Sequence, residues 1–186
     1  MAKVITLGVV EVNSIAKGIE ACDAMVKISD VELIDSYPIC PGKYIIIVSG
    51  DVAAVESSVA AGINVAGANF VDKLVLPRIH PDIIPGILGT TEIKKVEAVG
   101  VLETFSVAST IIAADASLKA AKVRMIEIRL AKGLGGKSFY TLTGDVADVR
   151  AAIEAGELII KKEGVLVNSV VIPDPHPYLK EQLLEW

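Results

Sequence analysis

Few side chains in this sequence of 186 residues have the chemistry of a nucleophile or a metal ligand. There are two cysteines, Cys22 and Cys40, and two histidines, His80 and His176. A thiolate nucleophile needs a base such as histidine within hydrogen-bonding reach, but both histidines precede a proline in equivalent turns that follow Cys40 at a distance. No Ser-His-Asp triad or carboxylate pair is apparent either, so we predict no catalytic residue and no enzyme.

A glycine-rich stretch, Gly133-Leu134-Gly135-Gly136, superficially resembles a phosphate-binding loop. It follows an expected strand and precedes Lys137 and another strand, whereas an anion-binding loop leads into the N-terminus of a helix. We therefore reject an anion site at this stretch.

The composition excludes several classes of partner. The 18 basic and 23 acidic side chains give a net charge of −5, and the basic residues are scattered, so we expect no nucleic acid. The longest stretch without a charged side chain, residues 57–71, has 15 residues, short of the roughly 20 that a membrane span needs.

Two cysteines and the start Met1-Ala2-Lys3 favour a cytosolic protein over a secreted one. A hydrophobic content of 52% with 4% aromatic residues favours an oligomer, because permanent interfaces also bury apolar surface.

The sequence contains an internal repeat. Gly8-Val9-Val10-Glu11 recurs as Gly100-Val101-Leu102-Glu103, and residues 8–34 match residues 100–126 at twelve of 27 positions. The offset of 92 becomes 94 at the Gly-Asp-Val-Ala motif of residues 50–53 and 96 at His80-Pro81. An internal repeat of this length indicates two related domains, which we place at residues 1–91 and 92–186.

Each repeat predicts the same elements. In the first, strands are expected at residues 4–12, 31–37, 43–49 and 72–76. A helix capped by Asn13 or Ser14, a second after Asp51 and a short one from Pro81 are also expected. Residues 38–42 are expected to form a loop, because both of their prolines block strand pairing. The order βαββαβ(α) predicts an α+β, ferredoxin-like fold in which helices pack on one antiparallel sheet.

Several motifs resemble those of bacterial microcompartment shell proteins with two shell (BMC) domains in tandem. They are Gly8-Val9-Val10-Glu11, residues 21–27, the Gly-Asp-Val-Ala motif and Pro77-Arg78-Ile79-His80-Pro81, and the resemblance spans residues 4–184. The loop Ile39-Cys40-Pro41-Gly42-Lys43 is similar to that of the trimeric members of propanediol utilisation. The resemblance implies unpermuted domains, a homotrimer with pseudo-sixfold symmetry, other shell proteins as partners, and a place in the microcompartment shell.

Cys40 has no counterpart in the second repeat, where residues 131–136 lack a thiol. One thiolate cannot hold an iron–sulfur cluster, which usually takes four, and from spacing alone Cys40 is an ordinary loop thiol. The resemblance implies an iron–sulfur cluster on the threefold axis, one per trimer, with Cys40 as its ligand; [4Fe-4S] is expected, and [3Fe-4S] and zinc remain alternatives. Cys22 aligns with Ala114 and is expected to be a buried small residue.

The resemblance also assigns two sets of residues around this site. The pore loops comprise Ile39, Pro41, Gly42, Lys132, Gly133, Leu134 and Gly135. The tile edge comprises Lys27, Lys119, Arg78 and His80, and Asp174 replaces the arginine in the second repeat. From the residues alone, Lys27 and Lys119 are solvated partners of a helix C-terminus, and the histidines are structural.

Three functions remain open at this point. A shell tile with an axial cluster would pass electrons across the shell, with encapsulated redox enzymes as partners, or would transport clusters. A tile without the cluster would offer a pore for small polar metabolites. A trimeric regulator that binds a metabolite is the third reading.

Overall fold

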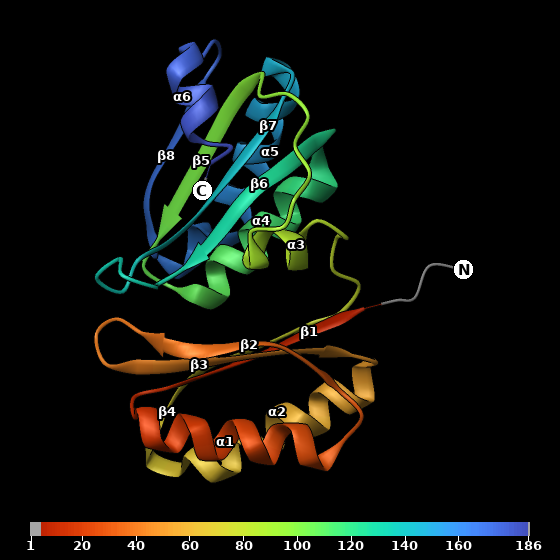
Figure 1. Ribbon diagram of the computed structural model, residues 1–186, viewed down its shortest axis with the longest axis vertical. Coiled ribbons are helices and arrows are strands. Elements are labelled where there is room, and N and C mark those ends of the chain that lie inside the picture. Colours follow the sequence, from red (N-terminus) through yellow and green to blue (C-terminus); the bar gives the residue numbers. More distant parts are fainter. Residues whose placement is uncertain (1–4, 186) are drawn as a thin grey trace. The chain divides into compact units, whose positions relative to one another are not determined.

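The computed structural model describes residues 5–185. Their contacts divide the chain into two compact units, residues 1–79 and residues 80–186. Each unit is built around a four-stranded antiparallel sheet (Figure 1). This confirms the expected α+β class and the duplicated architecture.

The first unit contains one sheet with two helices on one face. Its elements are β1 (Thr6–Val12), α1 (Ile15–Ile28), β2 (Glu32–Ile39), β3 (Lys43–Gly50), α2 (Val52–Ala66), the 3₁₀ turn η1 (Gly67–Asn69) and β4 (Phe70–Leu76). The strand order is β2-β3-β1-β4. Both α1 and α2 cover the same face of this sheet (Figure 1).

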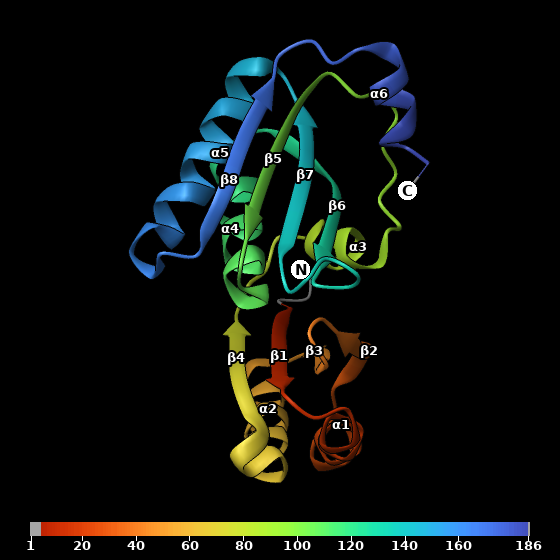
Figure 2. The ribbon, with the colours of Figure 1, turned by 90° about the vertical axis from the view of Figure 1, so that its left-hand side faces the viewer.

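The second unit repeats this plan and adds one short helix before it and another after it. Its elements are α3 (Ile83–Leu88), β5 (Ala98–Thr104), α4 (Val107–Ala120), β6 (Val123–Leu130), β7 (Ser138–Gly144), α5 (Val146–Ile160), η2 (Lys161–Glu163), β8 (Leu166–Ile172) and α6 (Pro177–Gln182). The order β6-β7-β5-β8 is the same as in the first unit (Figure 2). The first long helix of each unit is capped alike, since Ser14 accepts from the Lys17 N–H and Ser106 from the Ser109 N–H.

The glycine that opens each repeat motif is required by packing. A Cβ on Gly8 would lie 2.6 Å from Cγ1 of Val55, and one on Gly100 would lie 2.9 Å from Cγ1 of Val149. Both valines belong to the second long helix of their unit, α2 and α5. The shared glycine therefore lets that helix lie close against the central strand.

The two cores differ at two neighbouring positions that are apolar in the first and polar in the second. In the first, Met25 and Ile46 are fully buried among valines. In the second, the corresponding positions are Ser117 and Tyr140, whose hydroxyl groups lie 2.7 Å apart, and Ser117 also donates to the Ala152 carbonyl. The hydroxyl groups of Ser117 and Tyr140 are thus both hydrogen-bonded within the unit.

The expected loop at residues 38–42 is shorter than predicted. Strand β2 continues to Ile39, and Pro38 pairs with Tyr44 of β3. Proline is tolerated here because β2 is an edge strand, with a neighbour on one side only. The turn therefore consists of Cys40, Pro41 and Gly42.

Residues 80–91 belong to the first repeat in sequence but pack within the second unit. Helix α3 lies against β6 (Figure 2), and a Cβ on Gly86 would lie 2.8 Å from Cγ of Met125. The hydroxyl of Thr91 donates to the Ile126 carbonyl. The domain boundary between residues 91 and 92 stays a prediction, whereas the compact units meet at residues 79 and 80.

Candidate functional site

Cys40 lies at the tip of the β2–β3 hairpin. It is a free, partly exposed thiol in a three-residue turn, and the Cys40–Pro41 peptide bond is cis. Gly42 has a φ of +76°, and nothing within 4 Å would meet a Cβ there. Ile39, by contrast, is the last residue of β2 and only 4% exposed. The tip thus presents a thiol on a short turn whose glycine is open to solvent.

An ion pair holds the foot of this hairpin to the central strand. Nζ of Lys43 lies 2.6 Å from Oε1 of Glu11 on β1, and the Glu11 side chain is 8% exposed. In the second unit, Nζ of Lys137 lies 2.6 Å from Oε1 of Glu103 on β5, in a more exposed setting. These pairs are not among the residues predicted from the sequence, although a glutamate and a lysine recur together in both repeats and could have indicated them.

The hairpin of the second unit has a longer loop, residues 131–137, between β6 and β7. Gly133, Gly135 and Gly136 have positive φ angles, as does Ala131. Lys132, Gly133 and Gly135 are exposed, and Leu134 is half-buried. The loop is therefore polar at its surface and carries no thiol.

A single chain does not complete a metal site. Among residues 5–185, no three His, Cys, Asp or Glu side chains are grouped to hold one ion. Cys22 lies on α1 and is partly exposed beside the core, rather than fully buried as expected, because its side of α1 is open to solvent. A cluster at Cys40 would need thiolates from other copies of the chain, and three copies supply the thiolates of a cluster with one iron not held by cysteine.

The residues expected at a tile edge have different surroundings in the two units. Nζ of Lys27 pairs with Asp23 at 2.6 Å, and both side chains are exposed. Lys119 pairs with the corresponding Asp115, whose side chain is 8% exposed. The backbone N–H of His80 donates to the other oxygen of Asp115, at 2.8 Å. The structure thus brings Lys119 and His80 together through Asp115 and leaves Lys27 at the surface.

Arg78 is exposed and has a φ of +55°. Its counterpart Asp174 is also exposed and lies 3.4 Å from Nζ of Lys180. The assignment of these positions to a tile edge stays a prediction.

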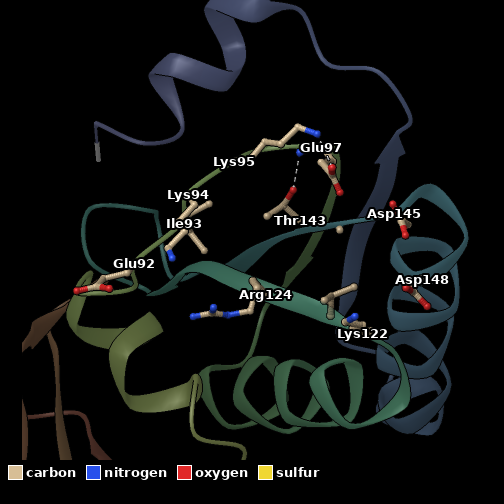
Figure 3. A pocket seen from close by; sticks show the side chains of 12 residues that line it. Glu92, Ile93, Lys94, Lys95, Glu97, Lys122, Arg124, Thr143, Asp145 and Asp148 are labelled. Atoms are coloured by element: carbon tan, nitrogen blue, oxygen red, sulfur yellow. Dashed lines mark hydrogen bonds and ion pairs between the residues drawn. The ribbon is translucent and has the colours of Figure 1, made fainter.

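The second unit contains an open pocket of about 680 Å³ at the start of α5 (Figure 3). It mixes basic and acidic side chains, and Nζ of Lys95 pairs with Glu97 at 2.6 Å. That pairing lowers the pKa of Glu97 and raises the pKa of Lys95. A smaller pocket in the first unit, of about 240 Å³, has Asp30 and Glu32 where the larger one has Lys122 and Arg124. With both signs of charge in the larger pocket, neither one selects a ligand class.

None of the helices described over residues 5–185 has the length and apolar character to cross a membrane.

Known proteins resemble both the sequence and the fold. The BMC domain family matches residues 6–79 and 98–175. The chain is 44% identical to the bacterial microcompartment shell protein PduT of Citrobacter freundii, over 96% of this chain and 97% of that protein. It is 39% identical to the shell protein EutM of Salmonella typhimurium over 46% of this chain and 86% of that protein, so one repeat corresponds to that single-domain relative.

A crystal structure of a microcompartment protein from Desulfitobacterium hafniense has a TM-score of 0.93 and 50% sequence identity, and the match covers 95% of this chain and 98% of that one. Together with the two BMC domain matches, this extends over nearly the whole chain. The chain belongs to the BMC domain family, with two such domains in tandem, and is a structural protein of a bacterial microcompartment shell.

Proposed function

We propose that three copies of the chain form a ring with pseudo-sixfold symmetry that carries an iron–sulfur cluster on its threefold axis through Cys40. The ring would serve as a shell tile beside other shell proteins and would pass electrons across the shell. The trimer is supported by the duplicated domain, since six similar units from three chains close the ring that six single-domain chains would form. Such a ring requires a heterologous interface that closes at a fixed rotation.

The observation that carries the cluster is the asymmetry of the two hairpins. One ends in a three-residue turn with a partly exposed thiol, and the other ends in a glycine-rich loop without one. If six hairpins face a common axis, every second tip therefore presents Cys40. Three thiolates suit a [4Fe-4S] cluster with one open iron position, or a [3Fe-4S] cluster.

The residues beside Cys40 are suited to hold such a group. Pro38 and Pro41 restrict the backbone on both sides of the thiol. Gly42 leaves space for close approach of the backbone, and Lys43 brings a positive charge to the foot of the turn. A bound cluster would supply a one-electron carrier, with encapsulated redox enzymes as its partners.

The test is anaerobic purification followed by electron spin resonance and by iron and sulfide counts per trimer. The expected result is a brown protein with one cluster per trimer. Cys40→Ser should remove the spectrum and the iron, whereas Cys22→Ser, the matched control, should keep both. A trimer that stays colourless after anaerobic reconstitution, or a Cys40→Ser variant that keeps the cluster, would overturn the cluster proposal.

A tile with a cluster-free pore is the alternative. The loop at residues 132–135 favours it, because its exposed Lys132 and glycines leave room and one charged side chain beside a passage for small polar metabolites. A colourless trimer supports this alternative, and wild-type protein that stays monomeric at every concentration would overturn both versions.

A further inference from the structure

Two turns of the same construction follow the last strand of each repeat. In the first, Nδ1 of His80 accepts a hydrogen bond from the Asp82 N–H at 3.2 Å. In the second, Nδ1 of His176 accepts from the Tyr178 N–H at 3.3 Å. Each turn leads into a short helix, α3 or α6. The two turns therefore present their backbone groups in the same way.

The first turn is docked on the second repeat. The His80 N–H donates to Oδ1 of Asp115 on α4 at 2.8 Å. The other oxygen of the same carboxylate, Oδ2, accepts a hydrogen bond from Nζ of Lys119. Nε of Arg124 on β6 lies 2.7 Å from Oδ2 of Asp82. Ile83 of α3 is fully buried. A turn-and-helix segment thus covers the α4 and β6 side of the repeat that follows it in the chain.

The equivalent donor in the second turn and the equivalent acceptor in the first repeat do not form this contact. Within residues 5–185, the His176 N–H has no hydrogen-bond acceptor, and Asp23, the counterpart of Asp115, is bound by Lys27 through Oδ2 alone. The Asp23 side chain is 60% exposed, against 8% for Asp115. One donor and one acceptor of the same contact therefore remain unused, one after the last strand of the second repeat and one on the first helix of the first repeat.

The apolar residues at these places follow the same pattern. Leu179 takes the place of the buried Ile83 and is 38% exposed. Leu33 on β2 takes the place of the fully buried Met125 on β6 and is 43% exposed. The Leu179 side of α6 and the Leu33 side of the first repeat thus each lack the apolar cover that their counterparts have, while Leu183, directly after α6, packs against the core of its own unit.

From this complementarity we propose that the His176 turn and α6 of one copy dock on α1 and β2 of a second copy, with Asp23 accepting the His176 N–H. The occupant is a second copy of this chain, because its free turn and helix are equivalent to the segment that covers the corresponding face within each chain. The contact is head-to-tail, as a closed ring requires. The inference rests on the proposed trimer and names the residues that join its copies.

The Asp82–Arg124 ion pair has no equivalent at the proposed contact between copies, so the contact within a chain and the contact between chains differ. Where Asp82 meets Arg124 within a chain, the junction between copies brings Tyr178 toward Glu32. A phenol donates a hydrogen bond to a carboxylate, whereas Asp82 in the place of Tyr178 would face Glu32 with a like charge. The segment at residues 80–91 is therefore unsuited to the junction between copies, which sets the order of the repeats around the ring.

The test follows the trimer through a dilution series by sedimentation velocity. Asp23→Ala should raise the concentration at which half of the trimer dissociates by at least about tenfold, because a hydrogen bond to a charged group is lost at each junction. Asp23→Asn should give a smaller increase, because its amide oxygen still accepts. Lys27→Ala is the matched control and should dissociate like the wild type, since it leaves the Asp23 carboxylate in place.

The outcomes separate this inference from the proposed function. Dissociation of Asp23→Ala at the wild-type concentration, with a circular dichroism spectrum that shows a folded chain, would overturn the Asp23 contact and leave the trimer standing. Wild-type protein that stays monomeric at every concentration would overturn both. Asp115→Ala should lower the unfolding midpoint of the chain without a comparable change in trimer dissociation, and the reverse result would also contradict the assignment.

Discussion

Lys43 and Glu11 form an ion pair of 2.6 Å that ties the base of the Cys40 turn to the central strand of its sheet. The equivalent pair of Lys137 and Glu103 has the same length but is more exposed. The two pairs are thus equivalent contacts that differ in how far solvent screens them. They offer a matched comparison within one molecule.

We expect Lys43→Ala to destabilise the fold more than Lys137→Ala. The first change leaves the Glu11 carboxylate, which is 8% exposed, without its partner. We estimate a loss of about 1–2 kcal/mol, reduced from the range for fully buried pairs because Lys43 itself is partly exposed. The second change should cost less than about 1 kcal/mol. Urea unfolding of the two variants measures the difference, and equal midpoints would contradict it.

Cys40→Ser should leave the trimer intact. Serine matches cysteine in size, and the thiol lies in a solvent-facing turn with no described side-chain hydrogen bond among residues 5–185. Sedimentation should give the wild-type mass while the cluster is lost. If the variant instead falls apart into monomers, Cys40 has a structural role in the trimer.

Lys27→Ala should weaken the assembly of tiles into sheets without unfolding the chain. The Lys27–Asp23 pair is exposed, and such pairs contribute about 0.3–0.5 kcal/mol on a helix, so the fold should survive. Electron microscopy of the assemblies measures the effect. Lys17→Ala removes a comparable exposed pair on the same helix and serves as the control. Sheets as extensive as those of the control would remove Lys27 from the tile edge.

Stability should fall in alkaline solution through Tyr37. Burial raises the pKa of Tyr37 from 10.0 to about 12, and the Asp35 carboxylate adds to the shift. The unfolded chain therefore loses this proton at lower pH than the folded one does. The contribution is intact below pH 10.0 and is lost as the pH rises through about 12. Urea midpoints measured across this window should drop less for Tyr37→Phe, and an equal drop would contradict the assignment.

The order of elements could be predicted from the sequence because periodicity and caps are local signals. Ser14, one of the two expected caps, does cap the first helix, and Gly8 and Gly100 do lie on the first strand of each sheet. The extent of β2 could not be predicted, since whether Pro38 interrupts a strand depends on its place at the edge of the sheet.

The contact of His80 with Asp115 could not be predicted either. Aligning the repeats shows which residues are shared, but not which surfaces meet, and the two residues are 35 positions apart. The Glu11–Lys43 and Glu103–Lys137 pairs were easier to predict from the sequence, because both partners recur in each repeat and adjoin the expected hairpins. The Cys40 site itself depends on symmetry, which a single chain does not contain.

The unequal hairpins also bear on crowding at the centre of the ring. A tile built from six identical single domains could change its axial loops only all at once, so one cysteine would become six thiols around a single point. Fusing two domains into one polypeptide lets alternate loops differ in sequence. In the proposed ring, the glycines at 133, 135 and 136 would occupy less space near the axis than a second set of larger side chains. In the proposed ring, covalent duplication would thus reduce the number of axial thiols from six to three, the number that the proposed cluster takes.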